Sequence, residues 1–172
     1  MSVAARARGD ASSKRRLRAW IRLLGATRAA EGALREFLRV EHGTTLPRFD
    51  VMAALHRRRE GVTMSQLSRM LLVSNGNATA LIDRLEQDGL VRRMPSPSDR
   101  RSILVALTPL GTSRFEALAA EHEAEVARLF APLSDADLDR LADILRRLAR
   151  HDPGTAREAV QDAGARAWTR PS

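Results

Sequence analysis

The hydrophobic and polar positions of this chain follow mainly the period of an α-helix. Apolar residues return every three or four positions over most of the sequence, a spacing that keeps one face of a helix buried. The predicted helices cover 14–42, Pro47 to near Gly61, 63–71, 74–88, 108–130 and 134–151.

Two of these helices carry clear signals at their N-termini. Thr63 and Gln66 form a T-x-x-Q capping box before the third helix, and Ser74 can cap the fourth. The apolar face of the fourth helix follows the spacing i, i+3, i+4, i+7 and consists of Ala78, Leu81, Ile82 and Leu85. The opposite face is therefore left for solvent or for a ligand.

Two short strands are predicted after the fourth helix, at Leu90–Met94 and Ser102–Leu107, around a loop that contains two prolines. The order helix, polar turn, helix and hairpin is typical of a winged helix-turn-helix, which places one helix in the major groove of DNA. We therefore predict a mainly α fold with a small β-hairpin wing, dimerised through N- and C-terminal helices.

The first and last helices carry more apolar surface than a small winged domain can cover. We expect this surface to be buried in a homodimer, and the alternative is that these helices pack on their own domain. The predicted division of the chain is a disordered basic arm over 1–13, an N-terminal dimerisation helix over 14–46, a DNA-binding domain over 47–108, C-terminal dimerisation helices over 109–151 and a tail over 152–172.

Composition narrows the function classes. The 172 residues carry a formal net charge of +8, which favours a polyanionic partner, although a basic surface can also serve solubility alone. The absence of cysteine excludes disulfides and thiolate metal sites. The four histidines are scattered and no catalytic motif stands out, so we expect no enzyme, no cofactor and no metal site. The sequence shows no transmembrane run or signal peptide, which favours a cytoplasmic location.

Short polar side chains crowd the first turn of the fourth helix. These candidates for contact with base edges and phosphates are Ser74, Asn75, Gly76, Asn77 and Thr79, with Arg84 farther along the same helix. An ordinary polar cap is the alternative, but the preceding capped helix and the following hairpin favour base contact.

Residues 99–111, with the sequence DRRSILVALTPLG, resemble the D-x-R…L-T-x-x-G wing signature of the MarR (multiple antibiotic resistance regulator) family. The resemblance implies a homodimer that reads a pseudo-palindromic double-stranded operator. It also implies that Asp99 orders the wing, that Arg101, with Arg100 beside it, reaches the minor groove, and that the turn over 74–79 reads bases.

Residues 46–55 and 64–91 are similar to the branch of this family that responds to aromatic acyl-CoA thioesters. That likeness implies release of DNA by a small effector, an aromatic acid or an aromatic acyl-CoA. Arg39, His42 and Arg48 are the candidate groups for its phosphates or carboxylate, and an ordinary ion-paired surface is the alternative for each.

Together these inferences predict a homodimeric, ligand-responsive transcriptional regulator, most simply a repressor. The alternative is a constitutive, ligand-independent architectural protein that binds DNA with weak sequence preference. The salt dependence of binding and the penalty for mismatched sites separate the two, because phosphate-only binding ignores sequence.

Overall fold

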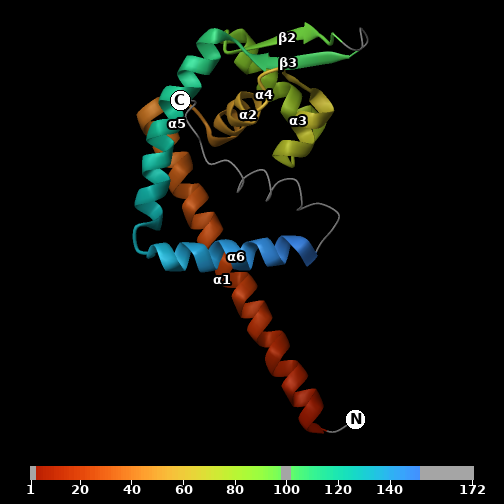
Figure 1. Ribbon diagram of the computed structural model, residues 1–172, viewed down its shortest axis with the longest axis vertical. Coiled ribbons are helices and arrows are strands. Elements are labelled where there is room, and N and C mark those ends of the chain that lie inside the picture. The colour runs from red at the N-terminus through yellow and green to blue at the C-terminus, as the bar shows by residue number, and fades with distance from the viewer. Residues whose placement is uncertain (1–2, 98–101, 152–172) are drawn as a thin grey trace. The chain divides into compact units, whose positions relative to one another are not determined.

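A computed structural model describes residues 3–97 and 102–151, with the side chains of residues 12–97 and 102–150. The elements are α1 (Val3–His42), α2 (Leu46–His56), β1 (Val62–Thr63), α3 (Met64–Leu71), α4 (Asn75–Gln87), β2 (Val91–Pro95), β3 (Ile103–Leu107), α5 (Pro109–Phe130) and α6 (Asp135–His151) (Figure 1). The mainly helical fold with a small antiparallel sheet confirms the predicted fold class. The chain divides into two compact units, with the boundary after Gly43.

Helix α1 makes up the first unit and begins at Val3, whereas we predicted an arm without regular structure through residue 13 and a helix from Lys14. The segment lacks an apolar period but is rich in alanine and arginine, which are among the strongest helix formers. Helix propensity therefore extends the helix where the hydrophobic pattern gives no signal.

The core of the second unit forms around α2, which contacts α3, α4, α5 and β3. Val51 and Leu55 of α2 are at most 1% exposed, and Phe49 at its start packs on Phe115 of α5 with ring centroids 5.5 Å apart. Helix α4 buries Ala78, Ile82 and Leu85 completely and Leu81 partly, which confirms its predicted apolar face. The other side of α4 is consequently held outward by this core.

The sheet has three antiparallel strands in the order β1-β3-β2. The predicted hairpin is present, with Val91 opposite Leu107 and Pro95 opposite Ile103. Pro95 is tolerated because β2 is an edge strand, where a missing N–H costs no ladder hydrogen bond. Strand β1 was not predicted, since two residues are too short to show alternation, and it pairs Val62 with Val105.

The hairpin is joined to α5 through close backbone contact, which we call the α5 joint (Gly89, Leu90, Thr108 and Gly111). Thr108 caps α5 by accepting a hydrogen bond from the Gly111 N–H at 2.9 Å, and its hydroxyl donates to the Gly89 carbonyl at 2.7 Å. A Cβ on Gly111 would lie 1.9 Å from the Leu90 carbonyl oxygen. The L-T-x-x-G part of the wing signature therefore has a structural role, which is to seat α5 on the base of the hairpin.

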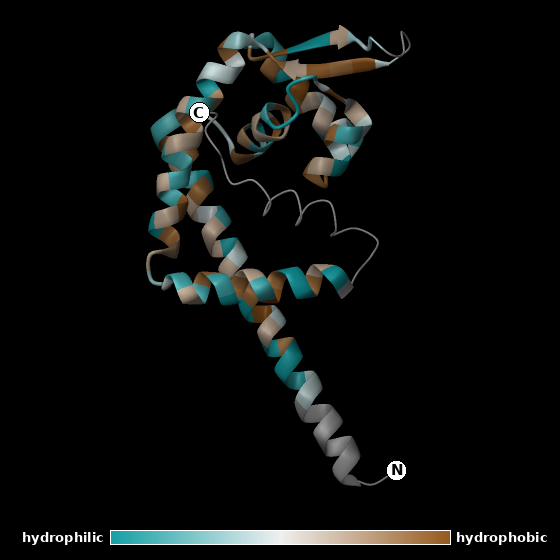
Figure 2. Cartoon of the chain, viewed as in Figure 1, coloured by the Kyte–Doolittle hydropathy of each residue, from teal (hydrophilic) through white to brown (hydrophobic). Residues whose placement is uncertain are grey.

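Helix α6 begins with a Ser134–Asp137 cap, in which the Ser134 hydroxyl donates to the Asp137 carboxylate at 2.6 Å. Its apolar residues remain largely exposed and alternate with charged residues along the helix (Figure 2); they include Leu138, Ile144, Leu145 and Leu148. The predicted tail over 152–172 lies outside the described residues.

Candidate nucleic-acid interface

Helices α3 and α4 are set by the two predicted caps. The Gln66 N–H donates to Thr63 Oγ1 at 3.2 Å, and the Thr63 N–H donates to Gln66 Oε1 at 2.8 Å, which completes the capping box. After the turn, Ser74 Oγ accepts a hydrogen bond from the Asn77 N–H at 3.3 Å. Both predicted caps are confirmed, and they define where the second helix of the pair starts.

The polar candidates on α4 lie together on its exposed side. Asn75, Gly76, Asn77, Thr79 and Arg84 are all exposed, whereas Ala78 between them is fully buried. A Cβ on Gly76 would meet no atom within 4 Å, so packing inside this chain does not require a glycine there. Close approach of another molecule remains our prediction for Gly76.

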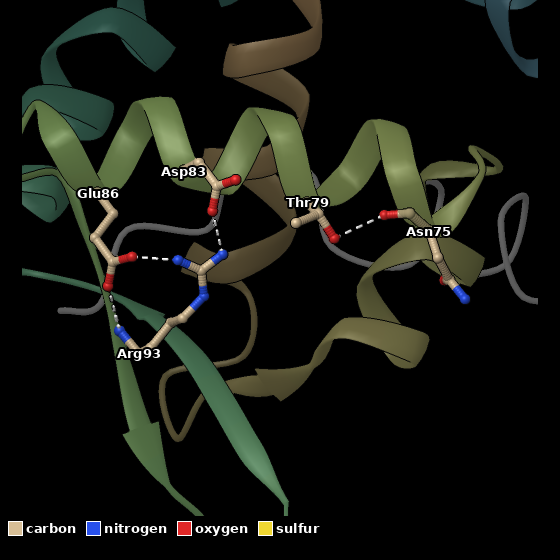
Figure 3. Close-up of polar contacts among 5 residues, drawn as sticks. All are labelled: Asn75, Thr79, Asp83, Glu86 and Arg93. Atoms are coloured by element: carbon tan, nitrogen blue, oxygen red, sulfur yellow. Dashed lines mark hydrogen bonds and ion pairs between the residues drawn. The ribbon is translucent and has the colours of Figure 1, made fainter.

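The Thr79 hydroxyl is already in use. Its Oγ1 donates to the Asn75 carbonyl oxygen at 2.9 Å (Figure 3). The side chain therefore offers a methyl group and the free lone pairs of its oxygen. This combination matches the thymine methyl or the exocyclic amino donors of adenine and cytosine better than the acceptors of guanine.

Arg93 on β2 binds two carboxylates on α4, and we call Arg93, Asp83 and Glu86 the Arg93 clamp (Figure 3). The guanidinium donates to Asp83 Oδ1 at 2.6 Å and makes an ion pair with Glu86. The Arg93 backbone N–H also donates to Glu86 Oε1 at 3.1 Å. The hydrogen bond to Asp83 and the charge of Glu86 raise the pKa of Arg93 despite its partial burial. The clamp therefore fastens the first wing strand to the exposed helix.

The clamp also reduces the negative charge on α4. Asp83 and Glu86 are one turn apart on a helix that would have to approach phosphates, and an unpaired carboxylate there would repel DNA. The sequence pattern placed Arg93 in a strand but indicated no partner for it. The i, i+3 spacing of the two acids, followed by an arginine after the Gly89 turn, was the available signal.

Known proteins resemble this chain in sequence and in fold. The model of the MarR family matches residues 44–103, which run from just before α2 to the first residue of β3. The transcriptional activatory protein BadR of Rhodopseudomonas palustris is 36% identical over 125 residues, which are 69% of this chain and 71% of BadR. This chain belongs to the MarR family.

Other family members are also similar to this chain, in sequence or in structure. The regulator PecS of Dickeya dadantii is 34% identical over 105 residues, covering 60% of this chain and only 63% of PecS. The crystal structure of the MarR family regulator AbsC from Streptomyces coelicolor superposes with a TM-score of 0.70 at 30% identity, over 77% of this chain and 90% of AbsC. A mutant of Escherichia coli MarR complexed with operator DNA superposes with a TM-score of 0.62 at 27% identity, over 74% and 91% of the two chains. Family members are DNA-binding transcriptional regulators.

The wing candidates Asp99, Arg100 and Arg101 lie outside the described residues, so their roles stay predictions. The strands that lead to them are described, and the Ser96 N–H donates to the Ser102 carbonyl at 2.9 Å at the end of the hairpin.

The effector candidates are divided between the two units. In α1, Arg39 makes hydrogen bonds of 2.9 Å and 2.6 Å to the Glu36 carboxylate, and the His42 ring meets Phe37 at 5.0 Å. In the second unit, Arg48 makes an ion pair with Asp88. Both arginines are thus paired with carboxylates, as expected of an ion-paired surface, and their role toward an effector stays a prediction.

His122 of α5 is half-buried and stacks on Phe49 with ring centroids 4.2 Å apart. Burial lowers the pKa of His122, and Glu125 opposes the shift only partly.

Within the described part of the chain, no group of three or more His, Cys, Asp or Glu side chains is placed to hold a metal ion. Among the helices over 3–97 and 102–151, none combines the length and apolar character needed to cross a membrane.

Proposed function

We propose that this MarR family protein acts as a homodimer that binds a pseudo-palindromic operator and represses transcription. The observation that carries the proposal is the exposed polar first turn of α4, held outward by a fully buried apolar face and fastened to the wing by the Arg93 clamp. In this arrangement α4 enters the major groove and the wing lies along the adjacent minor groove.

The side chains on α4 suit direct reading of bases. Asparagine can bind adenine through two hydrogen bonds, and both Asn75 and Asn77 are exposed. Arg84 is exposed and makes no ion pair among the described residues, so its guanidinium is free for phosphate or guanine. Arg100 and Arg101 supply the minor-groove contact in this proposal, with Asp99 ordering the loop.

The exposed apolar residues of α5 and α6 support a homodimer. Phe130 of α5 is 37% exposed, and Leu138 and Leu148 of α6 are 36% and 57% exposed, although each is large and apolar. Apolar helix faces of this kind are normally covered, and a second copy related by a two-fold axis would also supply the second reading helix. The domain limits predicted above, with dimerisation helices on both sides of the DNA-binding domain, belong to this proposal.

We further propose that a small aromatic acid or aromatic acyl-CoA releases the DNA. This part is supported by the resemblance of residues 46–55 and 64–91 to effector-responsive family members. Arg39, His42 and Arg48 are the groups to test. A thermal-shift panel of aromatic acids and their CoA thioesters measures the expected stabilisation, since any ligand that binds only the folded protein raises its melting temperature.

In vitro selection of duplexes from a random library tests the main proposal. We expect an inverted repeat with half-sites one helical turn apart, together with a dimer in sedimentation analysis. Selection of no consensus, with a steep salt dependence and no mismatch penalty, would favour the architectural alternative. A reporter gene placed downstream of the selected site then shows whether the protein represses or activates transcription. Activation would contradict the proposed repression and would match the activatory role that the name of BadR describes.

A further inference from the structure

The first half of α1 is strongly basic. Residues 11–30 contain six basic side chains and no aspartate or glutamate. Three of the six, Arg15, Arg18 and Arg22, follow the spacing i, i+3, i+7 and therefore lie along one face of the helix. We call these three residues the arginine stripe.

The arginine stripe is available to a partner. All three side chains are exposed, and none of them makes an ion pair within the described part of the chain. The Nε of Arg18 donates to the Lys14 carbonyl oxygen at 3.3 Å, which leaves the two terminal nitrogens of Arg18 for a ligand.

The second half of α1 shows the opposite arrangement of charge. Arg35 makes an ion pair with Glu31 at 2.9 Å. Arg39 makes one with Glu36 at 2.6 Å, so both arginines have a carboxylate one turn away. Within the arginine stripe the neighbours one turn away are like charges, which repel each other and destabilise the helix. A polyanion bound along this face would remove the repulsion.

The apolar side chains in this half of α1 lie on a different face. Leu17, Trp20 and Ile21 are 57%, 57% and 58% exposed, and together with Leu24 they follow the spacing i, i+3, i+4, i+7. At 100° per residue, the middle of this apolar stripe lies about 140° around the helix axis from the middle of the arginine stripe. A second copy packed on the apolar stripe, as in the proposed homodimer, therefore leaves the arginine stripe exposed.

Duplex DNA fits the arginine stripe in charge and in length. From Arg15 to Arg22 the helix rises about 10 Å, and B-DNA carries about six phosphate charges over the same length. A guanidinium suits phosphate because it can donate two parallel hydrogen bonds. An anionic membrane fits less well, because a helix that lies on a membrane buries its apolar face there, and the proposed homodimer covers that face.

The stripe lies far along α1 from the second unit. The length of helix to the boundary at Gly43 is about 30 Å from Arg22 and about 40 Å from Arg15. These lengths correspond to roughly ten base pairs of duplex. We therefore expect a phosphate contact made by the stripe to fall outside the half-site that α4 reads.

We infer that the arginine stripe of each protomer binds the phosphate backbone of the DNA that flanks the operator. This inference rests on the proposed function for the operator itself, and it gives the first half of α1 a role in DNA binding besides dimerisation. The contact adds affinity without selecting a sequence, because phosphates are the same at every base pair.

Binding to duplexes of different length tests the inference. One duplex is the inverted repeat selected by wild type, and the other carries about fifteen additional base pairs of arbitrary sequence on each side, roughly 50 Å of duplex. Fluorescence anisotropy at several salt concentrations compares wild type with the stripe variant, which combines Arg15→Gln, Arg18→Gln and Arg22→Gln. Glutamine and arginine have similar helix propensities, so α1 should remain a helix.

We expect wild type to bind the longer duplex more tightly than the shorter one. Its salt slope should also steepen on the longer duplex, by up to about 2.7 for each protomer, which is 0.9 for each of three phosphates. The stripe variant should match wild type on the shorter duplex and gain nothing from the flanks.

Two matched variants separate charge at the stripe from net charge and from side-chain shape. Arg114→Gln, Arg147→Gln and Arg150→Gln together remove the same charge from exposed arginines on α5 and α6, and this control should keep the gain from the flanks. Replacing the three stripe arginines by lysine retains the charge and should restore most of the gain, since lysine also binds phosphate.

An equal gain from the flanks in wild type and the stripe variant would overturn the inference while leaving the proposed function intact. Loss of the dimer in sedimentation of the stripe variant alone would also overturn it, because the stripe would then be structural. Binding of phosphatidylglycerol vesicles by wild type but not by the stripe variant, with no effect of the flanks, would identify a lipid surface as the partner and overturn it as well. Failure of wild type to select any duplex would instead refute the proposed function, and the inference with it.

Discussion

Replacing Gly111 by alanine tests the α5 joint with an outcome opposite in sign to the one expected from helix propensity. Gly111 lies in the first turn of α5, and alanine stabilises a helix by up to about 1 kcal/mol over glycine. Propensity alone therefore predicts a more stable protein. The structure predicts the reverse, because the added Cβ would lie 1.9 Å from the Leu90 carbonyl oxygen.

The cost follows from the contact. Ordinary Cβ contacts begin near 3.4 Å, so α5 and the hairpin would have to separate by roughly 1.5 Å, the difference between the two distances. The atom in the way is backbone and cannot rotate aside. Overpacking of this kind costs about 1–3 kcal/mol, and the Thr108–Gly89 hydrogen bond of 2.7 Å, worth about 1 kcal/mol, would be strained as well. After the propensity gain, we expect a net loss of about 1–3 kcal/mol in the free energy of unfolding.

Urea-induced unfolding followed by circular dichroism measures this loss. Protein concentration must be held fixed, since the stability of a dimer depends on it. Gly32→Ala in α1 is the matched control, because a Cβ there meets nothing within 4 Å and should stabilise by about 0.5–1 kcal/mol. If Gly111→Ala proved as stable as wild type while the control behaved as expected, the close contact at the α5 joint would be refuted.

Four further substitutions test other parts of the structure. Arg93→Ala leaves two α4 carboxylates unpaired, and we expect operator affinity in fluorescence anisotropy to fall about tenfold, or ~1.4 kcal/mol. Thr79→Ser retains the hydroxyl but removes the methyl group, so the preference of wild type for thymine over uracil in the selected duplex should disappear. Burial lowers the pKa of His122, so the unfolded chain binds this proton first and stability falls as the pH drops through 6.5; in urea titrations at several pH values, His122→Gln should show a shallower fall. Thr63→Ala removes the α3 capping box and should cost about 1 kcal/mol in the same assay.

Each of these expectations can fail separately. Wild-type affinity in Arg93→Ala would show that α4 tolerates both carboxylates unpaired. Equal affinity of the wild-type protein for thymine and uracil duplexes would remove the Thr79 methyl from base reading. Parallel pH profiles for wild type and the His122 variant would assign the acid sensitivity to other groups, and an unchanged unfolding midpoint in Thr63→Ala would show that the cap contributes little.

Sequence by itself determined the elements whose signals are local. The caps at Thr63 and Ser74 and the apolar face of α4 depend on residues within one or two helical turns, so the sequence shows all the partners involved. The order of helices and hairpin followed from the same signals. The start of α1 was predicted too late because alanine and arginine can extend a helix without any apolar period.

Tertiary structure decided every feature that joins residues distant in sequence. The pairing of β1 with β3 spans about forty residues, and the clamp joins Arg93 to a carboxylate ten positions earlier, on α4. The need for glycine at position 111 likewise comes from a neighbouring backbone, not from α5 itself. Burial of the shared core around α2 fixes how the helices and strands are oriented. That orientation decides which side chains from distant parts of the sequence come into contact. A linear pattern therefore predicted which helix carries the candidate base-reading side chains, whereas only the fold showed what holds that helix to the wing.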